Sequence, residues 1–346
     1  MKKTALYSNH INLKAKMINY NGWNMPISYT GIITEHLDVR QSAGLFDVSH
    51  MGIIDFYGDL AGEFLNEITV NDVFKLNNNK SQYSMICQED GIIIDDIIIS
   101  KCSNFYRMIV NASNREKDWQ WLELAKEKLN KKISFKWRND FSIIALQGSK
   151  SDQFLEKIGI KSRNIKKFCI EQISWKGINL LFSSTGYTGE KGYEIFVKNT
   201  KAGTLWSKLI EAGVTPIGLG ARDSLRIEAG LPLYGQEIQP GISPFDLNYD
   251  WVVKFNKKSF MAKKALLKSQ ENRKWVKGLV LDSRVMARPG TVVKEGGHVT
   301  SSTFSPTLSS PIAIFISNKE FPANDSVTLL VRGKEFSAKV VDLPFI

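Results

Sequence analysis

The stretch Gly91–Ile99 reads GIIIDDIII and places two adjacent carboxylates inside a run of six isoleucines. Such an apolar run predicts a strand that is buried on at least one face. Side chains alternate along a strand, so Asp95 and Asp96 are predicted to point to opposite faces, one serving structure and the other chemistry. The alternative is a tight turn or a strand edge at which both acids are solvated. Burying an ionised carboxylate without partners costs free energy, so these two acids are expected to have a structural or chemical role. The pair is therefore the first candidate site.

The residues around this stretch predict a compact α+β module between Met51 and about Arg138. Asp59 is predicted to N-cap a helix that turns Leu60, Phe64, Leu65 and Ile68 inward, and Asn114 to begin a second helix. The predicted strands of the module cover residues 52–57, 82–87, 92–99 and 106–110.

Strands and helices continue from Ser142 to about Tyr234, including a helix through Leu205–Ile210 that ends at Gly213. From Trp275 onward the pattern becomes all-β, which predicts a small antiparallel barrel or sandwich. The chain of 346 residues exceeds one ordinary core, so two or three domains are expected.

The net charge of +11 has two explanations that the sequence leaves open. A positive field attracts nucleic acid, an acidic protein or a polyanionic small substrate. The richness in Lys, Asn and Ile also fits an AT-rich genome without selection for any partner. The basic residues are spread along the chain, and no aromatic-basic signature of a nucleic-acid module is present, so no nucleic-acid partner is expected.

Other composition features exclude several protein classes. No apolar run is long enough for a membrane span or a signal peptide, which predicts a cytoplasmic protein without a membrane partner. The three cysteines are odd in number and widely spaced, and the four histidines are scattered without an HExxH pattern. We therefore expect neither a disulfide framework nor a metal site.

Two further segments carry glycines beside polar side chains. Gly186–Glu194 packs three glycines, two tyrosines and two acids into nine residues, which suits either a planar polar ligand or an ordinary glycine-rich hairpin. Gly218–Arg226 places two glycines before a helix with arginines at i and i+4. These arginines would attract an anion or pair with acids such as Asp223 and Glu228.

Taken in order, these segments resemble the T-protein family of the glycine cleavage system, which are tetrahydrofolate-dependent aminomethyltransferases. The resemblance covers essentially the whole chain, and many modest motifs in one order make it specific. The matching segments are Gly22–Pro26, Gly44–Met51, Asp95–Asp96, Val110–Ala112, Gly186–Glu194, Gly218–Glu228, Leu233–Glu237 and Thr303–Leu308.

This resemblance implies a three-domain α+β cloverleaf around a central folate, with a C-terminal antiparallel β-barrel. The expected domains are residues 1–50 plus 139–245, then a ferredoxin-like domain at 51–138, and a β-rich domain at 246–346. The implied reaction takes an aminomethyl group from the lipoyl arm of the H protein, releases ammonia and forms 5,10-methylenetetrahydrofolate. The implied partners are the lipoylated H protein and a folate that carries a polyglutamate tail.

The resemblance also assigns roles to individual residues. Asp96 is implied to be the catalytic carboxylate, which stabilises positive charge on the transferring carbon, while Asp95 holds the strand. The residues implied to bind folate are Met51, Tyr83, Val110, Asn111, Tyr187, Glu194 and Arg222.

Three alternatives differ from this function. One is a folate-dependent demethylase of a sulfur or amine compound, and another is a folate-binding protein that maintains iron–sulfur enzymes. The latter relatives carry a cysteine where Leu233 stands here. The third is a basic nucleic-acid-binding protein. Departures from the family pattern occur at Ile92, Ala262, Ser302 and Ser309, where relatives usually have glycine, and put local loop geometry in doubt.

Overall fold

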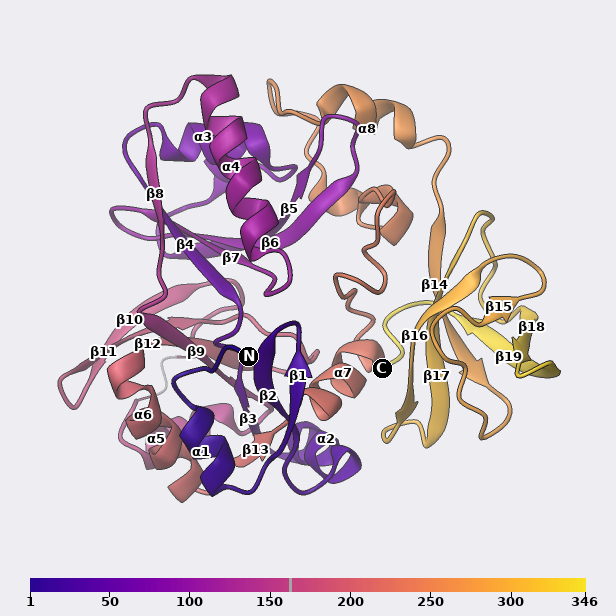
Figure 1. Cartoon of the computed structure of the whole chain (residues 1–346), viewed down its shortest axis with the longest axis horizontal. Coiled ribbons are helices and arrows are strands. Elements are labelled where there is room, and N and C mark those ends of the chain that lie inside the picture. The colour runs from indigo at the N-terminus through magenta and orange to yellow at the C-terminus, as the bar shows by residue number, and fades with distance from the viewer. Residues whose placement is uncertain (162–163) are drawn as a thin grey trace. The chain divides into compact units, whose positions relative to one another are not determined.

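The structure is a computed structural model that describes residues 1–161 and 164–346 (Figure 1). The chain separates into two compact units, and each is described by itself. The first unit contains Met1–Ser84, Asp95–Gly186 and Glu190–Arg222, and the second contains Met85–Ile94, Tyr187–Gly189 and Asp223–Ile346.

A six-stranded sheet forms one part of the first unit, in the order β10-β11-β12-β9-β3-β13. Its strands pair antiparallel except for β13, which runs parallel to β3. The strands are β3 (Gly44–Asp47), β9 (Phe141–Gln147), β10 (Ile170–Trp175), β11 (Ile178–Ser183), β12 (Gly192–Lys198) and β13 (Thr215–Ile217).

Helices complete this part of the first unit. The apolar sides of α5 and α6 join the sheet in one core, where Phe154, Leu205 and Trp206 pack with Leu45 and Ile195. The remaining elements here are α1 (Tyr7–Asn12), β1 (Lys16–Tyr20), β2 (Trp23–Ser28), α2 (Ile32–Gln41), α5 (Ser151–Lys157), α6 (Asn199–Glu211) and α7 (Leu219–Glu228), whose last residues from Asp223 belong to the second unit.

A five-stranded antiparallel sheet, in the order β5-β6-β7-β4-β8, carries the acidic pair. Helices α3 and α4 lie together against one face of it in Figure 1. Because Phe64, Leu65 and Leu122 are fully buried, each helix has one apolar side packed inside the domain, as Phe64 and Leu65 were predicted to be. The elements are β4 (Gly52–Tyr57), α3 (Ala61–Ile68), η1 (Val73–Lys75), β5 (Lys80–Cys87), β6 (Ile93–Lys101), β7 (Tyr106–Val110), α4 (Arg115–Leu129) and β8 (Ser134–Trp137).

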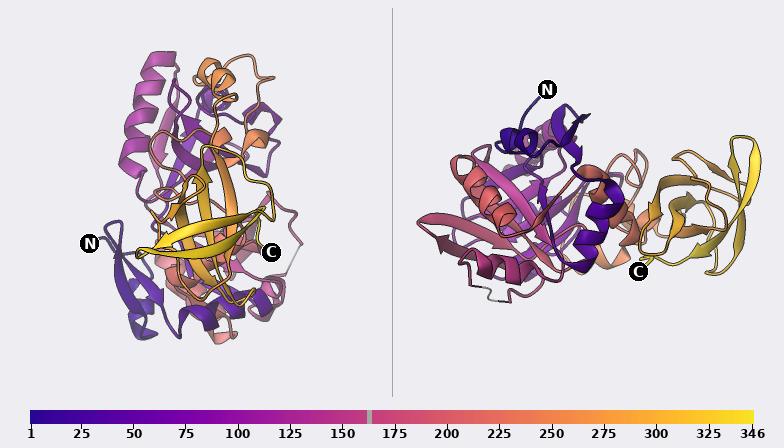
Figure 2. Two further views of the ribbon diagram at one scale, coloured as in Figure 1. Left: turned by 90° about the vertical axis from the view of Figure 1, so that its right-hand side faces the viewer. Right: turned by 90° about the horizontal axis from the view of Figure 1, so that it is seen from below.

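The second unit contains a closed six-stranded barrel in the order β14-β17-β16-β15-β18-β19, with β19 pairing back onto β14 (Figure 2). Buried residues from alternate strand positions, such as Leu279, Phe315 and Val340, fill its interior. Its elements are η2 (Phe245–Leu247), η3 (Asp250–Val252), α8 (Lys263–Ser269), β14 (Trp275–Leu281), β15 (Val292–Val293), β16 (His298–Ser305), β17 (Ser310–Ser317), β18 (Ser326–Val331) and β19 (Lys334–Val341).

The α+β class and the antiparallel C-terminal barrel are confirmed, whereas one helix start was wrong. Leu60 rather than Asp59 is the N-cap of α3, and Leu60 is 38% exposed instead of facing inward. The three predicted domain boundaries stay a prediction. In the described part of the chain, no helix is both long and apolar enough to cross a membrane.

Candidate functional site

The acidic pair lies where the pairing between β6 and β7 ends. Ile98 pairs with Ile109, and continuing this antiparallel register places Asn111, just after β7, opposite Asp96. On the other side of β7, Gly52 pairs with Val110, so Met51 lies opposite Asn111. The strand order therefore places four predicted site residues at one end of the sheet, namely Met51, Asp96, Val110 and Asn111.

Asp96 is half-buried and accepts hydrogen bonds from two other predicted site residues. Asn111 Nδ2 donates to its Oδ1 at 2.7 Å, and Tyr83 Oη donates to its Oδ2 at 3.2 Å. Burial and the charge of the adjacent Asp95 raise the pKa of Asp96 to about 7, although both hydrogen bonds oppose this shift. The carboxyl thus changes charge near neutral pH and can hold a cation or a proton donor.

Asp95 is fully buried and makes a different set of contacts. Its oxygens accept from the backbone N–H of Asn111 at 2.9 Å, from Asn111 Nδ2 at 2.9 Å, and from Asn114 Nδ2. One amide nitrogen of Asn111 therefore reaches both carboxylates. The two acids are chemically linked, which simple strand alternation did not predict.

Glu194 and Arg222 form a second polar group in the first unit. Glu194 lies in β12, is half-buried, and accepts from Thr185 Oγ1 through its Oε2. Burial raises the pKa of Glu194, while Thr185 and the charge of Arg222 counteract the shift. Oε1 of Glu194 accepts no hydrogen bond from the described residues, so it is available to an N–H donor of a ligand.

Tyr187 belongs to the second unit, in which its hydroxyl donates to the carbonyl of Pro232. Its place beside the other predicted residues stays a prediction. The neighbouring glycines have a structural explanation. A Cβ at Gly186 would lie 1.8 Å from Gln147 Oε1, and one at Gly192 would lie 2.7 Å from Gln147 Nε2. At Gly192 the backbone carbonyl of Leu146 is closer still, at 2.4 Å, so the groups that closely approach both glycines belong to the protein itself.

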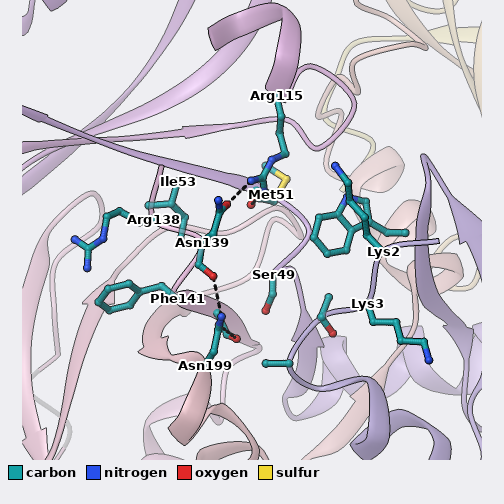
Figure 3. A pocket seen from close by; sticks show the side chains of 14 residues that line it. Lys2, Lys3, Ser49, Met51, Ile53, Arg115, Arg138, Asn139, Phe141 and Asn199 are labelled. Atoms are coloured by element: carbon teal, nitrogen blue, oxygen red, sulfur yellow. Dashed lines mark hydrogen bonds between the residues drawn. The ribbon is translucent and has the colours of Figure 1, made fainter. Parts of the chain in front are cut away.

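Met51 also lines a hollow of about 280 Å³ in the first unit (Figure 3). Arg115 donates there to the Met51 carbonyl at 3.3 Å and to Asn139 Oδ1 at 2.6 Å, with its guanidinium 4.6 Å from the Trp137 ring centre. Lys2 and Lys3 line the same hollow, and within the described chain neither lysine nor Arg115 forms an ion pair. This basic hollow is a candidate anion site.

His50 is a buried residue that the sequence did not single out. Its Nδ1 has no hydrogen-bond partner within the described residues, and its ring stacks edge-on against Tyr20. Burial, followed by the charges of Arg222 and Arg115, lowers the pKa of His50 to about 3, although Asp47 counteracts this. The ring is therefore neutral. Only its position within the motif Gly44–Met51 signalled it.

No group of histidine, cysteine and acidic side chains is arranged to hold a metal ion in the part of the chain that the structure describes. The hydrogen-bonded cluster at the sheet end consists of the carboxylates of Asp95 and Asp96, the amides of Asn111 and Asn114, and the phenol of Tyr83. Such a set suits an organic ligand with several N–H donors and a positively charged reacting centre.

Comparisons with known proteins cover the whole chain. Residues 6–257 match the family model described as GCVT N-terminal domain, and residues 273–346 match the one described as Glycine cleavage T-protein C-terminal barrel domain. The chain is 41% identical over 361 residues to an aminomethyltransferase of Halothermothrix orenii, with 100% of both chains covered. It is also 41% identical over 363 residues to one of Prosthecochloris aestuarii, with 100% and 99% covered.

A solved structure agrees with these sequence matches. The glycine cleavage system aminomethyltransferase T from Bartonella henselae superposes with a TM-score of 0.93 at 31% identity. The alignment covers 100% of this chain and 98% of that one.

Proposed function

Since the chain belongs to the glycine cleavage T-protein family, we propose that the cluster around Asp96 and Glu194 is its tetrahydrofolate site. The chain is a tetrahydrofolate-dependent aminomethyltransferase of the glycine cleavage system, with tetrahydrofolate as co-substrate. The reaction moves the carbon of an aminomethyl group to tetrahydrofolate and releases ammonia. The demethylase and iron–sulfur alternatives are not favoured.

The chemistry of the cluster fits the folate. A reduced pterin presents N–H donors along one edge, and the Oε1 of Glu194 is an acceptor that has no donor among the described residues. Val110 is fully buried, and we assign it to the apolar floor of this site. We assign Met51, Tyr83, Asn111 and Arg222 to the walls of this site, and Tyr187 to a ring contact with the ligand.

Asp96 is the residue that we assign to catalysis. The carbon that leaves the sulfur and bonds to the folate nitrogens carries positive charge on the way, and an ionised carboxylate held beside it lowers the energy of that state. The two hydrogen bonds from Asn111 and Tyr83 fix the carboxylate before the substrate arrives. This held, half-buried carboxylate is the observation that carries the proposal, and its raised pKa agrees with it, because a cation placed beside such a group stabilises the charged form.

The proposal extends to the partners. The H protein donates the aminomethyl group on its lipoyl arm, and we propose that the folate carries a polyglutamate tail. Both would be anionic and would suit the basic hollow, in which Lys2, Lys3 and Arg115 form no ion pair with the described residues. We also propose a cytoplasmic location.

The decisive assay supplies aminomethylated H protein and tetrahydrofolate, then measures ammonia and methylenetetrahydrofolate. Ammonia release that depends on folate is expected. If the rate of ammonia release is the same with and without folate, the proposed site is wrong. Salt-sensitive binding to DNA or RNA, measured in parallel, would instead support the nucleic-acid alternative.

The two acids provide a finer test. Asp96→Asn removes the charge beside the reacting carbon, so kcat is expected to fall by about 100-fold or more, a typical cost of losing one electrostatic contact. Asp95→Asn keeps that charge and is expected to cost far less. Circular dichroism and thermal melting check that both variants fold. Equal losses would show that the catalytic role was given to the wrong carboxylate.

A further inference from the structure

Asp118, on helix α4, is a third carboxyl in contact with the acidic pair and has no place in the site described above. Its side chain is fully buried, and its own backbone N–H is already used, donating to the Asn114 carbonyl at 2.8 Å. The carboxyl contacts that of Asp95. Neither of its oxygens accepts a hydrogen bond from any donor in the described residues.

The hydrogen-bond donors around the two carboxyls show which one holds a proton. Asp95 accepts from three N–H donors on Asn111 and Asn114, and an ionised carboxylate offers about four acceptor positions. Asp118 receives none, so an ionised Asp118 would be a buried charge without compensation beside another charge. A proton on Asp118 removes this penalty and supplies the fourth donor to Asp95.

The contacts continue from Asp95 to the catalytic position. Asn111 Nδ2 donates to Asp95 Oδ1 at 2.9 Å, to Asp96 Oδ1 at 2.7 Å and to the Asp96 carbonyl at 3.2 Å, so its two hydrogens are shared among acceptors on these two residues alone. The backbone N–H of Asn111 is also held by Asp95. Any rotation of the Asp95 carboxylate therefore changes the position of the amide that orients Asp96.

We propose that Asp118 is a positioning residue that stays protonated, donates its proton to Asp95, and through Asp95 and Asn111 holds Asp96 in its working orientation. This inference rests on the proposed function for its effect on catalysis, but the location of the proton is independent of it. Burial, followed by the charge of Asp95, raises the pKa of Asp118 to about 10, with Asp96 adding to the shift and Lys117 opposing it.

The first test compares two substitutions with opposite hydrogen-bonding ability. Asp118→Asn keeps an N–H donor for Asp95 in nearly the same shape, so kcat and KM for tetrahydrofolate are expected to stay within about threefold of the parent values. Asp118→Leu has similar size and no donor, and is expected to lower kcat about tenfold with little change in KM. Glu127→Leu, an exposed position on the same helix, is the matched control.

The outcomes of this comparison are distinct. Rescue by asparagine but not by leucine supports the proposal, since a role of simple packing would favour leucine. An equal loss of kcat in both variants, or an Asp118→Leu enzyme with full activity, would overturn it.

The second test locates the proton without using activity. Infrared spectra of the full-length protein at about pH 8 are expected to show the carbonyl stretch of a buried carboxylic acid, which shifts in D2O. The band should persist in Asp96→Asn and vanish in Asp118→Asn. Absence of the band in the parent protein, or its survival in folded Asp118→Asn, contradicts the proposal even if the folate assay succeeds. A band that behaves as expected in a protein without folate-dependent activity would leave the proton assignment standing and refute the proposed function alone.

Discussion

Asp96 carries its charge only above neutral pH, because burial and the adjacent Asp95 raise its pKa to about 7. If the ionised form performs the transfer, kcat/KM for tetrahydrofolate should rise through about pH 7 and level off above about pH 8. The measurement is a rate profile between about pH 5.5 and 9 at constant ionic strength. In Asp96→Asn, the low residual kcat/KM should no longer rise through about pH 7. A parent profile that falls over the same range would mean that the protonated acid is the active form.

The same ionisation affects stability in the opposite direction. The pKa of Asp96 is higher in the folded protein than the 3.8 of an unperturbed aspartate, so the unfolded chain releases the proton first. Its contribution to the free energy of unfolding is therefore full below about pH 4 and is lost as the pH rises through about 7. Comparing the urea unfolding of parent and Asp96→Asn proteins at about pH 5 and 8 measures this loss. A difference between the two proteins that does not depend on pH would contradict it.

Individual site residues differed in how far the sequence could predict them. The pair Asp95–Asp96 was identified because carboxylates in an isoleucine run need partners, and both acids do have hydrogen-bond partners. The choice of Asp96 over Asp95 came from the resemblance to the T-protein family. Asp118 could not be identified, because its meaning depends on a contact with Asp95 across the fold, and no local pattern encodes such a contact. His50 was not singled out, although it lies within the motif Gly44–Met51, because burial of its ring cannot be read from the local sequence.

At the scale of elements, Glu35 ties two segments of the first unit together. This fully buried side chain on α2 accepts from the backbone N–H groups of Tyr29, Thr30 and Gly31 at 2.6–3.0 Å. Its other oxygen accepts from Gly218 at 2.7 Å, just before the helix that carries Arg222. One carboxylate thus holds both the start of α2 and the start of α7.

Glu35→Ala leaves these four donors without their acceptor and is expected to lower the free energy of unfolding by about 3 kcal/mol or more. Because α7 positions Arg222, KM for tetrahydrofolate should also rise. Chemical denaturation and steady-state kinetics measure the two effects. Glu211→Ala, at an exposed ion pair, is the control and should change stability by less than about 1 kcal/mol. Equal stability of the two variants would show that Glu35 is dispensable.

Arg226 plays a comparable part inside the second unit, where it joins the end of α7 to the barrel. The buried guanidinium pairs with Glu237 at 2.8 Å and donates to Ser301 Oγ on β16 at 2.7 Å. The sequence suggested that the arginines pair with nearby acids, and the ion pair between Arg226 and Asp223 is confirmed. Glu228 instead accepts from Ser305 and Thr307.

Arg226→Met removes one charge and leaves Glu237 buried beside Thr300 without its cation, which should cost about 3–5 kcal/mol. Thermal melting is expected to show a large drop. A double variant, Arg226→Met with Glu237→Gln, should recover part of the loss because no buried charge is left unpaired. No recovery in the double variant would mean that packing by the arginine stem, rather than the charge pair, explains the effect.

The elements themselves were largely predictable, with failures that have physical causes. The strands at 82–87, 92–99 and 106–110 correspond to β5, β6 and β7, because apolar runs bounded by turn residues are strong local signals. The strand β16 was missed, since its sequence HVTSSTFS is mostly polar and is held by pairing with β17 and by contacts to Arg226 and Glu237. The wrong cap at Asp59 is a shift of one residue at a helix end.

For the whole molecule, the charge of +11 becomes testable through the basic hollow. Replacing Lys2 and Lys3 by glutamine removes two cations that have no ion pair in the described chain. We expect weaker binding to the H protein, which we proposed to be anionic, and a smaller salt dependence of that binding. Calorimetric titrations at low and moderate salt measure the affinity and its salt dependence. Exposed Lys264 and Lys268 on α8 provide the matched double control, and equal effects of the two pairs would show that the charge acts without a specific location.

The closed barrel has a consequence for how the protein behaves at high concentration. Because β19 pairs with β14, no strand of the barrel offers an unpaired backbone edge to another chain. Opening that one seam would expose two edges beside an apolar interior. Substitutions along the β14–β19 seam should therefore first cause concentration-dependent self-association.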